Sequence, residues 1–329
     1  MKRFLAPLLL LLGCGPAQPE LRIFTWSDYF AADTIAAFEK ETGCVVRVDY
    51  IESSDKLRAR LEGGASGFDV VFPSDEIVPV LAANGLLEKL DLARIPNAAN
   101  LDPAYRNLPF DPKNDVSLPY MSGSTGIAYH VEKVKPAPGG WSDVLRADAS
   151  LLDDAREVFA AALRAEGVEW TLDGLRRASK RLGTFTPKLW ESNPRLKLLE
   201  GDVAIAQCFS GDALQAVEAS KGRIAFVIPR EGGTLWIDNL CVAKGAPRRE
   251  LAHRFIDYLL RPEVSAAITN ERRFGNPNAA ARKLIRKELL ENPLIFPSED
   301  LRKRLSPLPP LSRELKKSLD QAWAELKAR

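Results

Sequence analysis

The chain has 329 residues, of which 46% are hydrophobic and 27% are charged, so it is long enough for two compact lobes and too mixed in composition for wholesale disorder. Its 46 basic and 44 acidic residues give a formal net charge of +2 and are spread along the whole chain without a block of like charge. This distribution argues against nucleic acid as a partner.

Residues 1–20 have the pattern of an export signal followed by a tether. Lys2 and Arg3 precede an apolar run that ends at Leu12, and this run is shorter than the roughly 20 apolar residues that span a bilayer. The run leads into Leu-Leu-Gly-Cys, which resembles a bacterial lipobox, in which the cysteine is acylated. We therefore predict export and a lipid anchor on Cys14. An ordinary secretory signal with a cysteine there by chance is the alternative.

Beyond the predicted lipid site, three cysteines remain, namely Cys44, Cys208 and Cys241. Their odd number and the lack of Cys-x-x-Cys spacing argue against a metal site and a disulfide framework, so we expect buried thiols, with one bridge possible. The chain has two histidines, His130 and His253, and no nucleophile-elbow, dinucleotide-binding or phosphate-loop motif. The sequence thus lacks the usual signatures of catalysis, metals and cofactors.

The first part of the chain alternates predicted strands and helices. Strands are expected at Leu21–Thr25, Val45–Ile51 and Asp69–Pro73, and helices from about Asp33 to Gly43 and around Asp55–Leu61. Gly43 stands where a helix end favours a left-handed residue. This alternation predicts an α/β fold with a mostly parallel sheet that is covered by helices on both faces.

A second series of elements begins after the glycine- and serine-rich segment 119–129. A helix is expected from Asp154 to about Glu166, closed by Gly167, and a last helix at Ser312–Lys327 carries an apolar stripe that should dock on a lobe. The other expected elements are strands at Val203–Phe209, Ile224–Ile228 and Leu235–Ala243 and a helix at Arg248–Leu260. The series indicates a second α/β lobe.

Aromatic and polar side chains lie near the ends of several predicted strands, which is where open α/β sheets bind their ligands. Trp26, Tyr29 and Ser74 follow predicted strands, and Trp236 and Asp238 lie beside the Gly232-Gly233 turn. Aromatic faces attract ammonium groups and shield methylene chains, while carboxylates neutralise the charged ends. The set indicates a site for an organic cation, whereas a tryptophan taken singly is more often a core residue.

Asp154 and Glu157 have three candidate roles. Asp-x-x-Glu before the apolar Val158 and Phe159 is a capping box, which satisfies the free N–H groups at a helix start, and spacing alone favours this role. The pair could instead bind a ligand, or act as the acid and base of a secreted hydrolase.

Five segments taken together resemble the bacterial periplasmic spermidine/putrescine-binding proteins, in the order of that family. They are Trp26-Ser27-Asp28-Tyr29, Phe72-Pro73-Ser74, Leu152–Phe159, Gly232–Asp238 and Pro277–Arg282, and the resemblance runs from about residue 21 to the C-terminus. It implies the two-lobed fold of type II periplasmic binding proteins, with the ligand in a cleft between the lobes. We expect lobe 1 to comprise residues 21–124 and 239–283, and lobe 2 residues 125–238 and 284–329.

The resemblance also implies which residues contact the ligand, with rings stacked on the polyamine chain and carboxylates paired with its amines. The implied residues are Trp26, Asp28, Tyr29, Ser74, Asp154, Glu157, Phe209, Trp236, Asp238 and Phe274. Three departures from the family pattern leave the length of the ligand open, and one of them is that the region of Pro309 supplies no counterpart of the glutamine that some members use near the C-terminus. Glu76 stands where the spermidine binders have a tyrosine, and Ser122 stands where relatives have a tryptophan. Glu76 would favour a more highly charged amine if it faced the cleft.

By this resemblance the chain is an exported receptor, without catalytic activity or cofactor, that delivers a polyamine to the permease and ATPase subunits of an ABC importer. We expect a monomer in the periplasm, held to the membrane through Cys14. A receptor for another small cationic solute is the alternative in the same class. A secreted hydrolase that uses Asp154 and Glu157 is the alternative in a different class.

Overall fold

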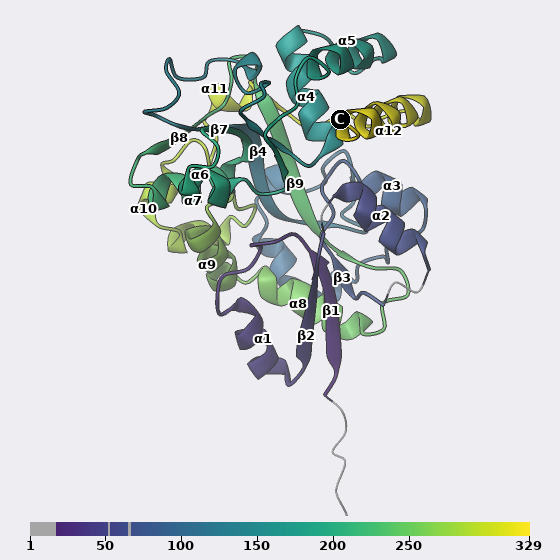
Figure 1. Cartoon of the computed structure of the whole chain (residues 1–329). Helices are drawn as coiled ribbons and strands as arrows, with labels where there is room; N and C mark the ends of the chain where they lie inside the picture. Colours follow the sequence, from purple (N-terminus) through teal and green to yellow (C-terminus); the bar gives the residue numbers. More distant parts are fainter. Residues whose placement is uncertain (1–17, 52, 65–66) are drawn as a thin grey trace, which may run out of the picture.

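The computed structural model describes residues 18–51, 53–64 and 67–329 (Figure 1), so the predicted export signal and Cys14 lie outside the described residues. The strands are β1 Glu20–Thr25, β2 Val45–Tyr50, β3 Val70–Val71, β4 Leu118–His130, β5 Ser150–Leu152, β6 Leu189–Glu191, β7 Ile205–Phe209, β8 Ile224–Val227, β9 Gly233–Val242 and β10 Leu305–Ser306. The helices are α1 Thr34–Thr42, α2 Ser54–Glu62, α3 Val78–Ala83, α4 Ala155–Glu166, α5 Leu172–Leu182, α6 Arg195–Glu200, α7 Ser210–Ala219, α8 Arg249–Leu259, α9 Pro262–Arg272, α10 Lys287–Leu290, α11 Glu299–Arg302 and α12 Arg313–Lys327. Within the described part of the chain, no helix is both long and apolar enough to cross a bilayer.

The helix ends that the sequence predicted are confirmed. Gly43 ends α1 with a φ of 70° and Gly167 ends α4 with a φ of 63°, both in the left-handed region that glycine adopts without a steric penalty. The sequence patterns did not predict β4, β5, β6, β10, α3, α6, α7, α9, α10 or α11. Seven of these ten elements have six residues or fewer, too short for a periodic pattern to stand out, and β4 is rich in glycine and serine, which are not typical of strands.

Two long strands, β4 and β9, connect the two ends of the sheet. The strand order is β2-β1-β3-β9-β4-β7-β5-β6, with β10 beside β9 and β8 beside β4. The pairs of β1 with β2 and β3, and of β5 with β6 and β7, are parallel as expected. In contrast, β4 and β9 pair antiparallel with each other, β9 with β3, and β4 with β7. The α/β class is thus confirmed, and the sheet is mixed. The chain passes along β4 from the half of the sheet that contains β1–β3 to the half that contains β5–β7, and it returns along β9.

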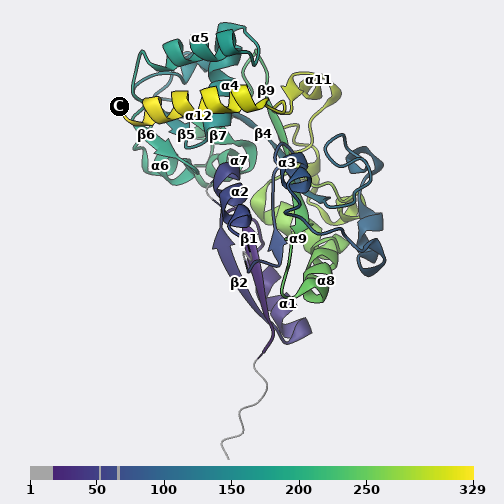
Figure 2. The same cartoon turned by 90° about the vertical axis from the view of Figure 1, so that its right-hand side faces the viewer.

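Two large hydrophobic cores pack against different parts of this sheet. One is built from residues between 21 and 121 and between 236 and 274, and it contains the fully buried rings of Phe38, Phe72 and Phe255. The other is built around Trp141 and Phe159 and includes Leu319 and Leu326 of α12. Figure 2 shows α12 lying along α4 and α5, so the predicted docking of the last helix is confirmed. The lobe boundaries themselves stay a prediction.

The three remaining cysteines are all buried. Cys44, Cys208 and Cys241 are free thiols, so the bridge left open by the sequence is not formed. Burial raises the pKa of the Cys208 and Cys241 thiols well above its usual value, which keeps them in the unreactive protonated form.

Candidate functional site

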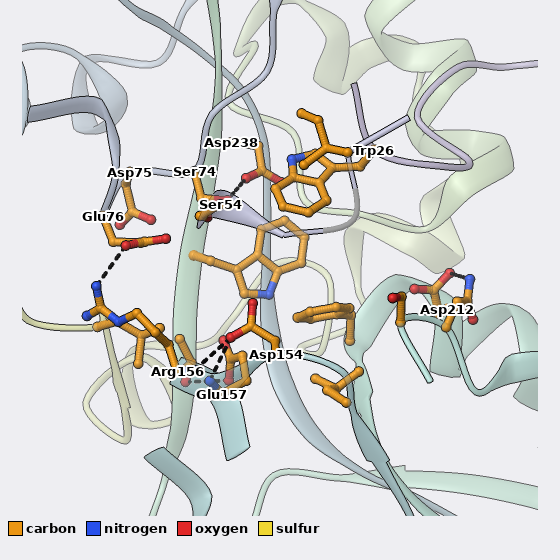
Figure 3. A pocket seen from close by; sticks show the side chains of 18 of the residues that line it. Trp26, Ser54, Ser74, Asp75, Glu76, Asp154, Arg156, Glu157, Asp212 and Asp238 are labelled. Atoms are coloured by element: carbon orange, nitrogen blue, oxygen red, sulfur yellow. Dashed lines mark hydrogen bonds and ion pairs between the residues drawn. The ribbon is translucent and has the colours of Figure 1, made fainter. Parts of the chain in front are cut away.

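A cavity of about 110 Å³ lies between the two predicted lobes. This volume is several times the roughly 10–15 Å³ that one water molecule requires, so the cavity has room for a small organic molecule. Ten of the eleven candidate ligand residues line it, namely Trp26, Tyr29, Ser74, Glu76, Asp154, Glu157, Phe209, Trp236, Asp238 and Phe274. Figure 3 shows Asp238, Ser74 and Trp26 on one side of this space and Asp154 and Glu157 on the opposite side.

Asp238 is the acidic centre of one side. It lies on β9 with 3% of its surface exposed, and it accepts hydrogen bonds from the hydroxyls of Ser74 and Tyr29. Burial raises the pKa of Asp238 to about 6, the two hydroxyl donors lower it, and the charge of Glu76 raises it further. The hydroxyls therefore hold the carboxylate in place without supplying a countercharge.

Trp26 and Tyr29 follow β1 as the sequence predicted. The indole Nε1 of Trp26 donates to the backbone oxygen of Phe72 at 2.9 Å, which fixes the ring beside the cavity. The Tyr29 ring is buried and lies 6.0 Å from the ring of Phe274, centroid to centroid. Both aromatic residues thus belong to the cavity wall and to the packing beneath it.

A glycine on β4 makes room for the indole of Trp236. Gly123 pairs with Trp236 across the β4–β9 ladder, and a Cβ atom at position 123 would lie 2.3 Å from the indole ring. The indole also meets Phe209 and Phe274 edge to face, at centroid distances of 5.9 and 5.4 Å. Together with Trp26 these rings give the cavity an aromatic wall, which favours a cation with an apolar body.

The start of α4 supplies two further carboxylates. Asp154 Oδ1 accepts hydrogen bonds from the backbone N–H groups of Arg156 at 2.8 Å and Glu157 at 3.1 Å, so Asp154 is the predicted helix cap. Glu157 does not complete the capping box, because its Oε2 accepts from the hydroxyl of Thr234 at 3.0 Å. Burial and then the charge of Asp154 raise the pKa of Glu157 to about 7. The prediction that Asp154 caps the helix is confirmed, whereas the prediction that Glu157 completes the capping box is wrong.

Glu76 lines the cavity, but its charge is already matched. Its Oε2 lies 2.7 Å from the Nη1 of Arg156, and the two side chains are only 11% and 14% exposed. The other terminal nitrogen of Arg156 donates to the backbone oxygen of Pro309. The expectation that Glu76 adds a free carboxylate for a more highly charged amine therefore needs correction, since a guanidinium neutralises it.

Asp28 and Ser122 do not line the cavity. Asp28 has a φ of 58° and lies between two guanidinium groups, 2.7 Å from Arg195 and 3.6 Å from Arg272. Its charge thus has partners within the protein. Ser122 is buried, and its hydroxyl lies 3.1 Å from that of Tyr105. The structure therefore does not bring either residue to the cavity.

Asp75 and Asp212 also line the cavity, although the sequence patterns did not indicate them. Asp212 lies three residues after β7 and accepts from the side-chain amide of Asn193 at 2.8 Å. Burial is the main reason that the pKa of each carboxyl is raised to about 7. Asp212 follows a strand end just as Trp26 and Ser74 do, so the same positional signal applied to β7 could have found it.

The cavity is strongly acidic. Seven carboxylates line it against a single guanidinium, that of Arg156. The carboxylates are Asp75, Glu76, Asp153, Asp154, Glu157, Asp212 and Asp238. Carboxylates crowded in a buried space repel one another and favour their neutral forms. A ligand that carries positive charge relieves this repulsion, whereas an anion would increase it.

Comparisons with known proteins agree with this chemistry. The profile of a family described as bacterial extracellular solute-binding protein matches residues 33–296. The chain is 34% identical to the putrescine-binding periplasmic protein PotF of Escherichia coli, over 94% of the chain and 92% of that protein. It is 32% identical to the spermidine/putrescine-binding periplasmic protein of the same organism, over 91% of the chain and 90% of that protein. The solved structure of the Tp0655 (TpPotD) lipoprotein of Treponema pallidum superposes with a TM-score of 0.81 at 28% identity, covering 94% of the chain and all of that structure.

Proposed function

The chain belongs to the bacterial extracellular solute-binding proteins, and we propose that it captures a polyamine outside the cytoplasm and delivers it to an ABC importer. The relatives that match nearly the whole chain are named for putrescine or spermidine. The observation that carries the proposal is the cavity itself, in which seven carboxylates and one guanidinium stand beside an aromatic wall. A polyamine fits this lining, because it joins ammonium groups through methylene chains.

The proposed binding mode uses both sides of the cavity. One ammonium would pair with Asp238 and a second with Glu157 on the opposite side of the cavity, while Asp212, which lies 4.0 Å from a terminal nitrogen of Arg195, would add acidic charge at the edge of the lining. The methylene chain would lie against Trp26 and Trp236. A ligand held by groups from both predicted lobes stabilises their closed arrangement, because it binds that arrangement better than an open one. The permease would recognise the closed form, and no covalent bond changes.

A calorimetric titration of the purified protein tests this function. We expect putrescine or spermidine to bind at least tenfold more tightly than arginine or glycine betaine. Arginine brings a carboxylate into an acidic cavity, and the quaternary ammonium of glycine betaine has no N–H to donate. Tighter binding of arginine or glycine betaine than of either polyamine would contradict the proposal.

The geometry disfavours the hydrolase alternative. Glycosidase carboxylates flank the scissile bond from two sides, whereas Asp154 and Glu157 lie together at the start of α4 (Figure 3). One of them also serves as the helix cap. We therefore propose a binding protein without turnover. Product release from a panel of glycosides and amides that disappears in Glu157→Gln would overturn this proposal.

We also propose that the chain is a monomer held to the membrane by a lipid on Cys14. The support is the order of basic residues, apolar run and Leu-Leu-Gly-Cys in the sequence, together with a matching structure that is named a lipoprotein. In a bacterial host, Cys14→Ser should move the protein from the membrane fraction to the soluble fraction. An unchanged distribution between the fractions would count against the anchor.

A further inference from the structure

Arg156 and Glu76 stand between the ligand cavity and a second, larger space. Beyond the cavity lies a groove of about 730 Å³ between α2 and α12. The cavity and the groove share six lining residues, which include both partners of this ion pair. In Figure 3 the pair lies to one side of the cavity, away from Asp212. The ion pair is therefore a partition between the two spaces.

Several contacts hold the partition in place. The guanidinium of Arg156 binds Glu76 at 2.7 Å and donates to the backbone oxygen of Pro309 with its other terminal nitrogen. It also lies 5.6 Å from the ring centroid of Trp170. A planar guanidinium with partners on two edges and one face has little freedom to turn away. A ligand that extended in this direction would have to displace it.

The groove beyond the partition differs from the cavity in charge. Among the groove residues that the cavity does not share, five are basic and two are acidic. The two acidic residues are Asp55 and Asp320, and both contact the ammonium of Lys316. An ammonium that entered the groove would meet excess positive charge, and the two carboxylates there already have a partner.

We propose that the Arg156–Glu76 partition limits ligand length, so that the chain selects a diamine such as putrescine over the longer triamine spermidine. This inference rests on the proposed polyamine-binding function. The cavity provides carboxylates for two ammonium groups, and the guanidinium repels a third where the chain of a triamine would continue. Arg156 and Glu76 are thus specificity-determining residues.

The test compares the dissociation constants of putrescine and spermidine by calorimetry. For the natural sequence we expect spermidine to bind at least tenfold more weakly. Arg156→Met keeps the length of the side chain but removes its charge and frees the carboxylate of Glu76 for a third ammonium. This variant should lower the spermidine-to-putrescine ratio of dissociation constants at least fivefold. A smaller preference in the natural sequence, or a smaller change in the variant, overturns the inference.

Glu76→Gln separates the charge from the packing of the pair. The glutamine still accepts a hydrogen bond from Arg156 but leaves the guanidinium charge unbalanced, so the ratio should stay the same or rise. A partition that acted only by filling space would leave the ratio unchanged in both variants, because both substitutions keep the size of the side chain, and this outcome overturns the role of charge. If Arg156→Met fails to fold, Arg156→Gln replaces it, because glutamine also removes the charge but can still donate a hydrogen bond to Pro309, and a fall of less than threefold then overturns the inference.

The matched control is Arg261→Met. Arg261 binds Glu41 at the same distance of 2.7 Å, and neither residue lines the cavity or the groove. The control should leave the ratio unchanged within twofold. If neither amine binds the natural sequence, the proposed function itself fails. If both bind but the ratio does not respond to Arg156, only the length limit fails.

Discussion

Asp238 illustrates how a single residue can serve both the fold and the ligand. The hydroxyls of Ser74 and Tyr29 donate hydrogen bonds to its carboxylate and so orient it. Among the described contacts of this side chain, no cationic group neutralises the charge. Burial of a carboxylate without a cationic partner is unfavourable in free energy, and a bound cation removes much of this penalty. By contrast, Asp28 and Glu76 are each paired with arginine.

Replacement of Asp238 by asparagine should weaken polyamine binding. The amide can keep the contacts with Ser74 and Tyr29 but loses a charge-assisted partner for the amine, so we expect a loss of about 1–3 kcal/mol in calorimetric binding free energy. Glu41→Gln is the comparison and should leave the affinity unchanged, because Glu41 pairs with Arg261 within predicted lobe 1 and lies outside the cavity lining. Unchanged affinity in Asp238→Asn would refute the role of this carboxylate.

The raised pKa values predict that binding depends on pH. Burial raises the pKa of Asp75, Glu157 and Asp212 to about 7 and that of Asp238 to about 6, whereas a bound ammonium favours the ionised forms. Binding should therefore release protons near pH 6 to 7, and the affinity should rise with pH through this window and level off above it. Deprotonating one group costs about 1.4 kcal/mol per pH unit below its pKa.

We accordingly expect the putrescine affinity to fall by roughly tenfold or more between pH 8 and pH 5.5. Calorimetry in two buffers with different ionisation enthalpies measures the released protons directly. Equal heats in both buffers at pH 6.5 would show that no carboxylate titrates on binding and would contradict this prediction.

At the scale of elements, the start of α4 combines a helix cap with a cavity wall. Asp154 satisfies two backbone N–H groups of the first turn and also lines the cavity. Glu157 lies one turn further along and bonds Thr234 of β9, which links the helix to the sheet. The helix can therefore place two carboxylates at the cavity without strain, because their geometry follows from its first turn.

Two substitutions at Asp154 should separate these roles. Asparagine caps a helix about as well as aspartate, so Asp154→Asn should keep the free energy of unfolding within about 0.5 kcal/mol while it weakens polyamine binding. Alanine cannot cap, so Asp154→Ala should also lose about 0.5–2 kcal/mol of stability. Urea unfolding and calorimetry on both variants measure the two effects. Equal stability of the two variants would argue against capping.

At the scale of the whole molecule, ion pairs link the two predicted lobes around the cavity. Four such pairs are Asp28–Arg195 and Glu76–Arg156, each at 2.7 Å, Asp55–Lys316 at 3.0 Å and Glu218–Arg273 at 2.5 Å. In the first three the acidic residue belongs to predicted lobe 1, and in the fourth it belongs to predicted lobe 2. These pairs should therefore favour contact between the two predicted lobes even without a ligand.

High salt should therefore favour opening of the ligand-free protein. Partly exposed pairs contribute about 0.2–1 kcal/mol each, and 1 M salt shortens the screening length to about 3 Å. We expect the radius of gyration in small-angle X-ray scattering to increase from 0.05 M to 1 M sodium chloride without ligand, and to stay constant with saturating putrescine. An equal radius of gyration at both salt concentrations without ligand would contradict this role of the pairs.

The α/β class, about half of the helices and strands, and the preference of the site for a cation could be predicted from the sequence. They depend on local patterns, such as left-handed glycines at helix ends, alternating strands and helices, and aromatic or acidic residues just after strands. The direction and pairing of the strands in the sheet could not be predicted in the same way. The antiparallel course of β4 and β9 depends on how distant segments pair, and no short pattern encodes it.

The sequence by itself determined which aromatic and acidic side chains stand at or near strand ends, and such positions are where open α/β sheets bind their ligands. Only the tertiary structure decided which of their charges a ligand can use. Arg156 lies 80 residues from Glu76 and Arg195 lies 167 residues from Asp28, so the neutralisation of these two carboxylates has no local signal. The fold likewise brought Asp212 to the cavity and left Asp238 with hydroxyl partners alone. The sequence states which residues carry a charge. Whether a ligand can pair with that charge depends on the burial and the partners of the side chain, which exist only once the chain has folded.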